Sequence, residues 1–396
     1  MKRDLRRVLP FLLAGMLVWL SGCALPSYAA TPESPAAAAA KKAPASDCGL
    51  PACDQLVVTQ DGRPGRAQSA ASFALPAGQE NSPWKIDTGV PSPDGSKVAY
   101  TSISSESGGP VFVQNVASGE WTNLIDAVNA RLPEGQPPFA LDYAWDVIGW
   151  FPKSDRLMIG PLDLSLVVVV DLSTYAAQPI PFPGGGRGGR MFVDLAPDGS
   201  RFIFIGDDSA GNQVMSQMHI DTGQVSELLR LPYEQGVLSN PRFSPDQASV
   251  AYTLQTGQPD PGLAYSIMLF STQTGQVSQL VEDTQTMTAP LWSPDGRKIA
   301  YVRGEDAPSL AVGKDALPQD QRTNVWVITP ADGQTAQATF ADGFVRSPAW
   351  AADSQTLAFV MGDGQVNLAS LDQPGQTWQA AAPIAVPELS SAFFLP

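Results

Sequence analysis

One short pattern recurs six times along this 396-residue chain, and it constrains the fold more than any other feature. Each copy has an aromatic or apolar residue, a small residue, Pro-Asp-Gly or a variant of it, and then a run rich in β-formers. The fullest copy is Trp292-Ser293-Pro294-Asp295-Gly296, and the last, Trp350-Ala351-Ala352-Asp353-Ser354, is degenerate. Equivalent positions are 93, 152, 197, 245, 294 and 352. A repeat of 45 to 59 residues is typical of four-stranded propeller blades.

Each repeat has a second half that also predicts a hairpin, as where Met268-Leu269-Phe270 leads to Gln273-Thr274-Gly275. In the Pro-Asp-Gly turns, Pro presets φ, Asp bonds its own backbone and Gly accepts a positive φ. A single four-stranded blade cannot bury both of its faces, whereas six blades in a ring can. The sequence therefore predicts an all-β fold, a six-bladed β-propeller of four-stranded antiparallel blades. The large side chains expected at the seams between blades are Trp150, Phe243, Trp292 and Trp350.

The repeats resemble those of TolB-like six-bladed β-propellers, which also occur as the propeller domains of prolyl oligopeptidases. The resemblance covers about residues 84–382. It implies the fold directly, but this fold hosts many functions. For function it implies docking, since the family includes periplasmic proteins that dock onto other envelope proteins. The sequence does not decide how the ring closes. Either 56–58 or 392–394 is expected to add a strand to a terminal blade, which would cover the exposed edge of that blade.

The start of the chain has the pattern of an export signal. A basic segment, Lys2 to Arg7, precedes a 15-residue apolar run from Val8 to Gly22, which is short for a membrane-spanning helix. The run ends in Leu20-Ser21-Gly22-Cys23, which resembles the lipobox of bacterial lipoproteins. We therefore expect residues 1–22 to be a signal peptide and Cys23 to be lipidated. The alternatives are a soluble exported protein cut after Ser27-Tyr28-Ala29 and an uncleaved anchor.

The segment after Cys23 is rich in Ala and Pro and nearly free of large apolar residues, so 23–47 is predicted to be a tether. The propeller domain is expected to occupy 48–396. The pair Cys48 and Cys53 is predicted to form a structural disulfide, because thiols outside the cytoplasm oxidise. A redox pair is the alternative, but it usually has two intervening residues and a helix N-terminus.

The charge of the chain restricts its partners. Formal net charge is -15, and removal of the basic N-terminal segment would make the remainder more acidic still. Such a body repels nucleic acid and anionic lipid head groups. The expected partners are an envelope protein or a surface ligand, together with the membrane through the N-terminal lipid, and the chain is expected to be a monomer.

Blade topology predicts which face binds. In a four-stranded meander, the first-to-second and third-to-fourth turns share one face, and the remaining connections share the other. All the long connections, 126–146, 255–265 and 303–324, fall on that second face, where binding usually occurs. Lineage-specific decoration is the alternative. The candidate binding residues are Phe139, Tyr143, Trp145, Arg187, Arg190, Asp207, Asp208, Tyr265, Glu305 and Asp306.

Enzymatic motifs are scarce. The one histidine, His219, lies in a predicted strand, and no Gly-x-Ser-x-Gly elbow exists. The Gly-rich loop 183–190 lacks the spacing of a phosphate-binding loop, and the acidic pairs at 207–208 and 305–306 lack the alternating ligands of a calcium loop. No catalytic residue, metal or cofactor is predicted. An extracellular hydrolase or lyase that uses carboxylates at the channel mouth on a carbohydrate stays as the alternative.

Overall fold

The structure is a computed structural model that describes residues 55–60, 63–66, 85–103, 109–139, 144–161, 166–181, 192–256, 264–282, 284, 288–305, 322–381 and 391–395. The chain divides into two compact units, Met1–Pro44 and Ala45–Pro396, and all the described residues belong to the second. Among the described residues no helix is long and apolar enough to cross a membrane.

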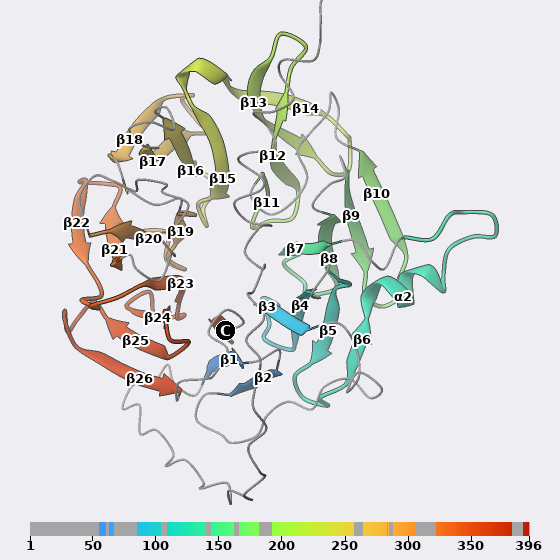
Figure 1. The fold of residues 1–396 in the computed structure, drawn as a ribbon. Coiled ribbons are helices and arrows are strands. Elements are labelled where there is room, and N and C mark those ends of the chain that lie inside the picture. The colour runs from blue at the N-terminus through green and yellow to red at the C-terminus, as the bar shows by residue number, and fades with distance from the viewer. Residues whose placement is uncertain are drawn as a thin grey trace, which may run out of the picture. The chain divides into compact units, whose positions relative to one another are not determined.

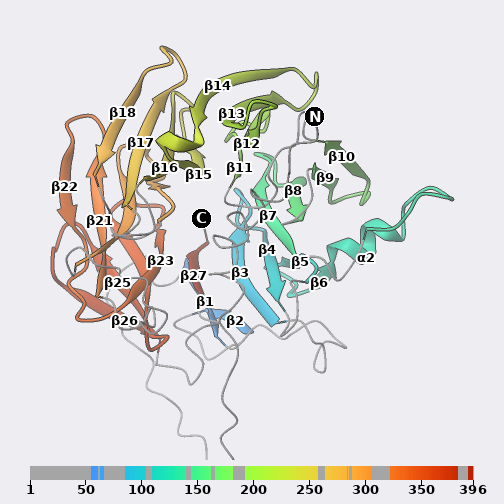
Figure 2. The same ribbon diagram turned by 45° about the horizontal axis from the view of Figure 1, so that its top comes forward.

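Six sheets of four antiparallel strands form the blades of a β-propeller, which confirms the predicted fold (Figure 1). The first strand of each blade lies near the centre of the ring and the fourth lies at the outside (Figures 1 and 2). Blades one to three are β3 (Lys85–Pro91), β4 (Lys97–Ile103), β5 (Phe112–Asn115), β6 (Trp121–Asn123); β7 (Trp145–Trp150), β8 (Arg156–Pro161), β9 (Leu166–Asp171), β10 (Ala177–Pro181); and β11 (Val193–Leu195), β12 (Arg201–Asp207), β13 (Asn212–His219), β14 (Val225–Pro232).

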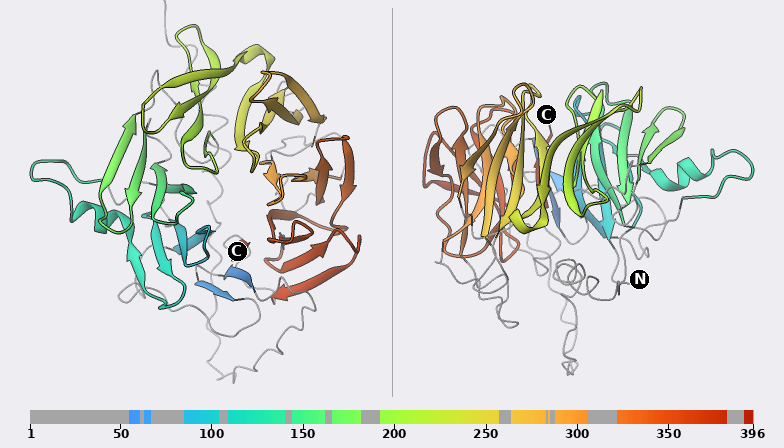
Figure 3. Two further views of the ribbon diagram at one scale, coloured as in Figure 1. Left: turned by 180° about the vertical axis from the view of Figure 1, so that it is seen from behind. Right: turned by 90° about the horizontal axis from the view of Figure 1, so that it is seen from above.

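Blades four to six repeat the same meander, seen from behind and from above in Figure 3. Their strands are β15 (Val237–Phe243), β16 (Ser249–Thr256), β17 (Ala264–Ser271), β18 (Val277–Val281); β19 (Leu291–Trp292), β20 (Ile299–Gly304), β21 (Thr323–Thr329), β22 (Gln334–Gln337); and β23 (Val345–Trp350), β24 (Thr356–Met361), β25 (Val366–Ser370), β26 (Thr377–Ala381). The predicted strand around His219 is confirmed, since β13 ends there.

The Pro-Asp-Gly turns take the conformation that their residues favour. In blade one, Asp94 Oδ1 accepts hydrogen bonds from Ser92 Oγ at 2.7 Å and from Ser96 N at 3.0 Å. These bonds, with that of the Ser96 N–H foremost, hold the pKa of Asp94 well below its usual range. The third turn position has φ between 56° and 70° in all six blades, occupied by Gly95, Ser154, Gly199, Gln247, Gly296 and Ser354. Only glycine adopts this region without strain.

Large side chains fill the seams between blades, as predicted. Trp150, Phe243 and Trp350 are buried, and Trp292 packs partly buried in the seam of blades four and five. The three indoles also make an equivalent bond to the preceding blade. Trp150 Nε1 donates to Val90 O at 2.8 Å, Trp292 Nε1 to Arg242 O at 3.2 Å and Trp350 Nε1 to Leu291 O at 3.0 Å. Each seam of this kind is thus held by one directional bond in addition to apolar packing.

The ring closes differently from the expectation. Neither 56–58 nor 392–394 joins a terminal blade. Instead, β1 (Leu56–Gln60) pairs with β27 (Ser391–Phe394) on one side and with β2 (Arg63–Arg66) on the other, in a separate three-stranded sheet. This sheet lies between blades one and six, with β27 against β3 and β23. The two ends of the domain pair with each other because each supplies the open backbone edge that the other needs.

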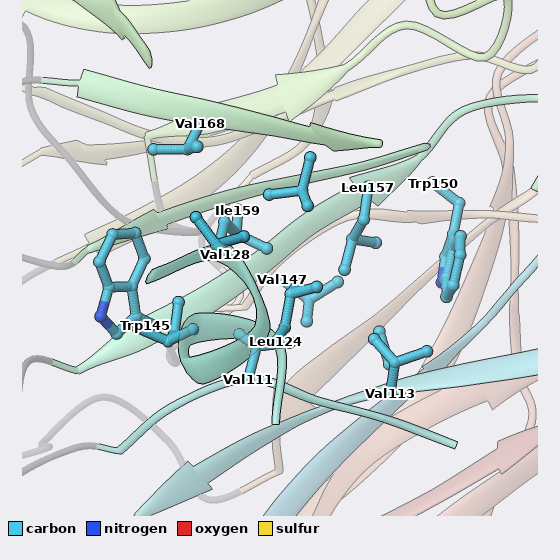
Figure 4. Close-up of a cluster of buried hydrophobic side chains, with 13 residues drawn as sticks. Val111, Val113, Leu124, Val128, Trp145, Val147, Trp150, Leu157, Ile159 and Val168 are labelled. Atoms are coloured by element: carbon cyan, nitrogen blue, oxygen red, sulfur yellow. The ribbon is translucent and has the colours of Figure 1, made fainter. Parts of the chain in front are cut away.

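A short helix departs from the prediction of strands and loops alone. The segment after β6 forms α2 (Leu124–Asn129), whose N-terminus is capped by Asn123 Oδ1. Leu124 and Val128 pack with Val147 and Ile159 in the core of blades one and two (Figure 4). With six residues the helix is too short to show a clear hydrophobic period in the sequence.

Candidate functional site

The two faces of the ring carry different connections, and we call them the short-turn face and the long-loop face. The short-turn face holds the turns between the first and second strands and between the third and fourth strands of each blade. In five blades a backbone N–H after the third strand donates to the first turn, over 2.9–3.0 Å, from Val116, Leu172, Ile220, Thr272 and Leu371. Blade five has Pro330 at this position, which has no N–H.

Neighbouring turns on the short-turn face also bond to each other. Asp94 N donates to Ser154 Oγ at 3.2 Å, and Asp295 N donates to Ser354 Oγ at 3.1 Å. Lys298 Nζ adds a bond to Ser354 O at 3.2 Å. Many backbone groups of this face are therefore hydrogen-bonded within or between the short turns. The longer connections lie on the opposite face.

The long-loop face holds every other connection, as the topology predicted. Its described parts include α2 with the segment that follows it, the β12–β13 turn, and η3 (Tyr233–Gln235) between blades three and four. Residues 257–263 and 306–321, in the other two long connections, lie outside the described residues. Seven of the predicted functional positions also lie outside the described residues: Cys23, Cys48, Cys53, Tyr143, Arg187, Arg190 and Asp306.

Phe139 and Trp145 lie together at the base of the β6–β7 connection. Their rings meet edge to face with centroids 5.7 Å apart, and Trp145 is buried. Asn129 fixes the segment between them and α2, because its Oδ1 accepts from Phe139 N at 2.8 Å and its Nδ2 donates to Phe139 O at 2.9 Å. These two aromatic residues therefore anchor the base of the segment that projects after α2 (Figure 3).

Asp207 and Asp208 also serve the fold. Asp208 Oδ1 accepts from Ala210 N and Asn212 N, both at 2.8 Å, which closes the β12–β13 turn. Asp208 Oδ2 forms an ion pair with Arg230. Asp207 Oδ1 accepts from Tyr233 Oη at 2.6 Å, which ties this turn to η3. Within the described residues no group of three or more His, Cys, Asp or Glu is placed to hold a metal ion.

Glu305 belongs to a polar cluster at the long-loop end of blade five. Its Oε1 accepts from Trp326 Nε1 at 2.9 Å, and Arg303 lies over the Trp326 ring at 5.3 Å. Tyr265, in blade four, is half-buried, and burial raises the pKa of its phenol. Glu305, Arg303 and Trp326 thus form a partly exposed group beside the 306–321 connection, and they are better placed for recognition than Phe139 or Trp145.

A charge pair that the sequence reasoning missed lies on the innermost strands. Asp194 of β11 and Arg242 of β15 approach to 3.7 Å, with side chains 18% and 20% exposed. Asp194 Oδ2 also accepts from Phe243 N at 2.9 Å. Burial raises the pKa of Asp194 to about 6, against the opposing effects of Arg242 and the Phe243 N–H.

The position of Asp194 explains its burial. It occupies the same place in blade three that Val90, Arg242 and Leu291 occupy in blades one, four and five, where a backbone carbonyl accepts from a tryptophan of the next blade. Blade four has Phe243 instead of tryptophan, so this seam lacks an indole donor. The Asp194 carboxylate supplies the cross-seam bond in its place. Two features of the sequence could have indicated this pair: Phe243 replaces the tryptophan at the seam position of blade four, and a charged residue, Asp194, occupies the facing position of blade three.

Comparison with known proteins extends these findings. No protein-family model matches the chain. It is 26% identical over 97 residues to the Tol-Pal system protein TolB of Alcanivorax borkumensis, covering 24% of this chain and 19% of that protein. Part of the propeller is thus similar in sequence to part of TolB. The chain is also 23% identical over 157 residues to an uncharacterized peptidase, YuxL, of Bacillus subtilis, covering 39% of this chain and 21% of that protein. The chain thus matches about a fifth of the length of these curated relatives.

A solved structure with the same fold is an oligogalacturonate lyase from Vibrio parahaemolyticus. It superposes with a TM-score of 0.53 at 12% identity, over 77% of this chain and 82% of the lyase. At this identity the likeness concerns the fold alone, since one propeller architecture supports unrelated activities.

Proposed function

We propose that the chain is an exported, lipid-anchored protein of the cell envelope whose propeller docks an envelope protein or a surface ligand through its long-loop face. The observation that carries this proposal is the difference between the two faces. Short turns bonded to one another close one face, whereas the opposite face collects all the longer connections. A rigid scaffold that carries variable loops on one side is the usual design of a binding module.

The TolB-like character of the domain supports the envelope setting. The TolB that this chain matches is described as a protein of the Tol-Pal system. The similarity supports protein binding in the envelope in general terms. The identity of this chain's partner is a question for experiment, because the match covers a fifth of TolB.

Lipid anchoring follows from the N-terminal sequence. The lipobox-like Leu20-Ser21-Gly22-Cys23 closes the apolar run, and 23–47 would serve as the tether. Cells fed an alkynyl fatty acid should label the wild-type protein, and Cys23→Ser should abolish the label. Persistent labelling of Cys23→Ser would remove the anchor from the proposal and leave the docking face intact.

The docking face is tested by affinity purification of the tagged full chain from crosslinked native membranes. A stoichiometric partner should appear, and it should be lost when residues 306–321 are replaced by a four-residue turn. The matched control is Thr222→Ala with Thr274→Ala, two exposed changes on the short-turn face that should retain the partner. Recovery of the same partner with the shortened loop would overturn the assignment of the face.

A carbohydrate-active enzyme is the second candidate, favoured by Asp194. Its carboxyl group has a pKa of about 6 on an innermost strand, a value suited to proton transfer near neutral pH. A lyase on oligogalacturonate also shares the fold. Turnover of an acidic oligosaccharide that disappears in Asp194→Asn while binding persists would favour this candidate over docking.

A further inference from the structure

A cleft of about 310 Å³ opens between strands β21 and β22 of blade five and the β23–β24 and β25–β26 turns of blade six, near the short-turn face. Lys298, Gln334 and Ala336 line it from blade five, and Gln355, Leu371 and Pro374 line it from blade six. The β20, β24 and β25 residues that line it lie at or next to the short-turn ends of those strands, and on β22 the lining reaches Gln337, which pairs with Trp326 at mid-strand. The cleft therefore opens mainly toward the short-turn face, opposite the face proposed above for docking.

The register of blade five explains why the seam opens at this point. Gln334 pairs with Thr329 and Ala336 pairs with Val327, so all four side chains lie on the face toward blade six. Deeper in the same seam, the side chains of Val325, Leu357 and Phe359 are buried together in one apolar cluster. At the outer strand, the small side chain of Ala336 is exposed and lines the cleft. The seam is thus filled at its base and open at its rim.

The polar groups of the cleft are neutral overall. The amides of Gln334 and Gln355 each offer donors and acceptors, and the described part of the chain gives their side chains no hydrogen-bond partner. The one cation, Lys298, is committed to Ser354 O at 3.2 Å. Its charge is also offset by two carboxylates, since it helps to lower the pKa of Asp295 and of Asp353. The cleft therefore offers hydrogen bonds without a net charge to attract an anion.

An exposed aromatic ring lies close to the wall of the cleft. Phe340 is 57% exposed, the largest exposed fraction among the large hydrophobic side chains described. A Cβ placed at Gly375 would lie 3.8 Å from its ring, so the ring lies against the β25–β26 turn, next to Pro374 of the cleft wall. An open ring beside amide groups suits a ligand with one apolar face and a polar rim.

We infer that this cleft binds an uncharged oligosaccharide, whose hydroxyl groups bond the amides of Gln334 and Gln355 while Phe340 stacks on the apolar face of a sugar ring. A pyranose has this combination of a C–H face and a hydroxyl rim. An anionic sugar gains nothing from the offset charge of Lys298. A peptide has no regular apolar face for the ring and is treated as a competing outcome.

The test is calorimetric titration of the full chain, in a sugar-free zwitterionic detergent, with cellotetraose, chitotetraose and maltotetraose. Tetragalacturonate and a Gly-Ser tetrapeptide are the comparison ligands. At least one uncharged tetrasaccharide should bind saturably. Both Gln334→Ala with Gln355→Ala and Phe340→Ala should weaken that binding at least tenfold without altering the unfolding midpoint.

The matched control is Gln276→Ala, the residue of blade four that corresponds to Gln334, and it should bind as the wild type does. Three results would overturn the inference: none of the uncharged sugars binds, binding is equal in all variants, or the tetrapeptide or tetragalacturonate binds in preference. Each variant carries substitutions of exposed or half-buried side chains, so a fold check by circular dichroism separates lost binding from lost structure.

Discussion

The Asp194–Arg242 pair makes a quantitative prediction about pH. The pKa of Asp194 is about 6 in the folded protein, against 3.8 for an unperturbed aspartate. A difference of about two units corresponds to about 3 kcal/mol between the two protonation states. Because the folded pKa is the higher one, the folded protein holds this proton more tightly than the unfolded chain does. Stability from this group should be greatest below pH 4 and should be lost as the pH rises through 6.

The perturbation is Asp194→Asn, which keeps an oxygen acceptor for Phe243 N but cannot ionise. Urea denaturation followed by tryptophan fluorescence, from pH 4 to pH 7.5, gives the free energy of unfolding of both proteins. The difference between them should change by about 2 kcal/mol across this range, because at pH 4 the unfolded carboxyl group is already partly ionised, and the wild type should lose stability relative to the variant as the pH rises. The comparison cancels the other carboxylates, including Asp171, whose pKa is lowered to about 2 by hydrogen bonds from Ser173 and Thr174.

The predicted pH dependence arises only if the Asp194 carboxylate is desolvated, so the denaturation experiment can refute that environment. Arg242 keeps hydrogen bonds to Pro241 O at 2.9 Å and Val193 O at 3.5 Å in the variant, which limits the disturbance. Parallel stability curves for wild type and Asp194→Asn would show that Asp194 titrates as an exposed group does. The assignment of a desolvated carboxylate at this seam would then be wrong.

Three further predictions concern the fold. Gly199→Ala should lower the free energy of unfolding, measured by urea titration, by about 1–3 kcal/mol, because φ is 70° and the new Cβ would lie 2.7 Å from Phe151. The control Gly119→Ala has the same kind of backbone, with φ 71°, but open space around the new Cβ, so it should lower the free energy of unfolding by about 1 kcal/mol or less. Trp350→Phe should lower the free energy of unfolding by about 1 kcal/mol, because it removes the hydrogen bond to Leu291 O. An unchanged unfolding midpoint would show that this bond does not stabilise the fold. Deleting 391–396 should lower the thermal midpoint by several degrees, since β27 and the buried Leu395 are lost, and an unchanged midpoint would show that the closing sheet does not stabilise the ring.

The repeats made the blades predictable because each one combines a turn of fixed chemistry with alternating apolar strands. Both signals are local, so the turn at Asp94 and the seam position of Trp292 were evident in the sequence. The closing sheet was not, because β1 and β27 are brought together only by the ring, and their pairing is a contact between positions more than 300 residues apart.

The candidate site was predictable only as a face. Chain topology assigns the loops to one side without coordinates, but it does not say which loop residues serve the fold. Phe139, Trp145 and Asp208 looked like binding residues and are held by internal contacts. Asp194 looked like an ordinary strand residue, and its environment depends on Phe243 from the next blade, 49 positions away. Such pairs across seams leave no local pattern.

Photocrosslinking from two positions at opposite ends of one strand tests the docking proposal. Ser209 lies in the β12–β13 turn on the long-loop face, and Thr222 lies in the β13–β14 turn on the short-turn face; both are exposed. With a photoreactive amino acid at either position in cells, docking through the long-loop face predicts a discrete protein adduct from 209 and none from 222. An adduct from 222 alone would place the partner on the short-turn face and refute the proposal.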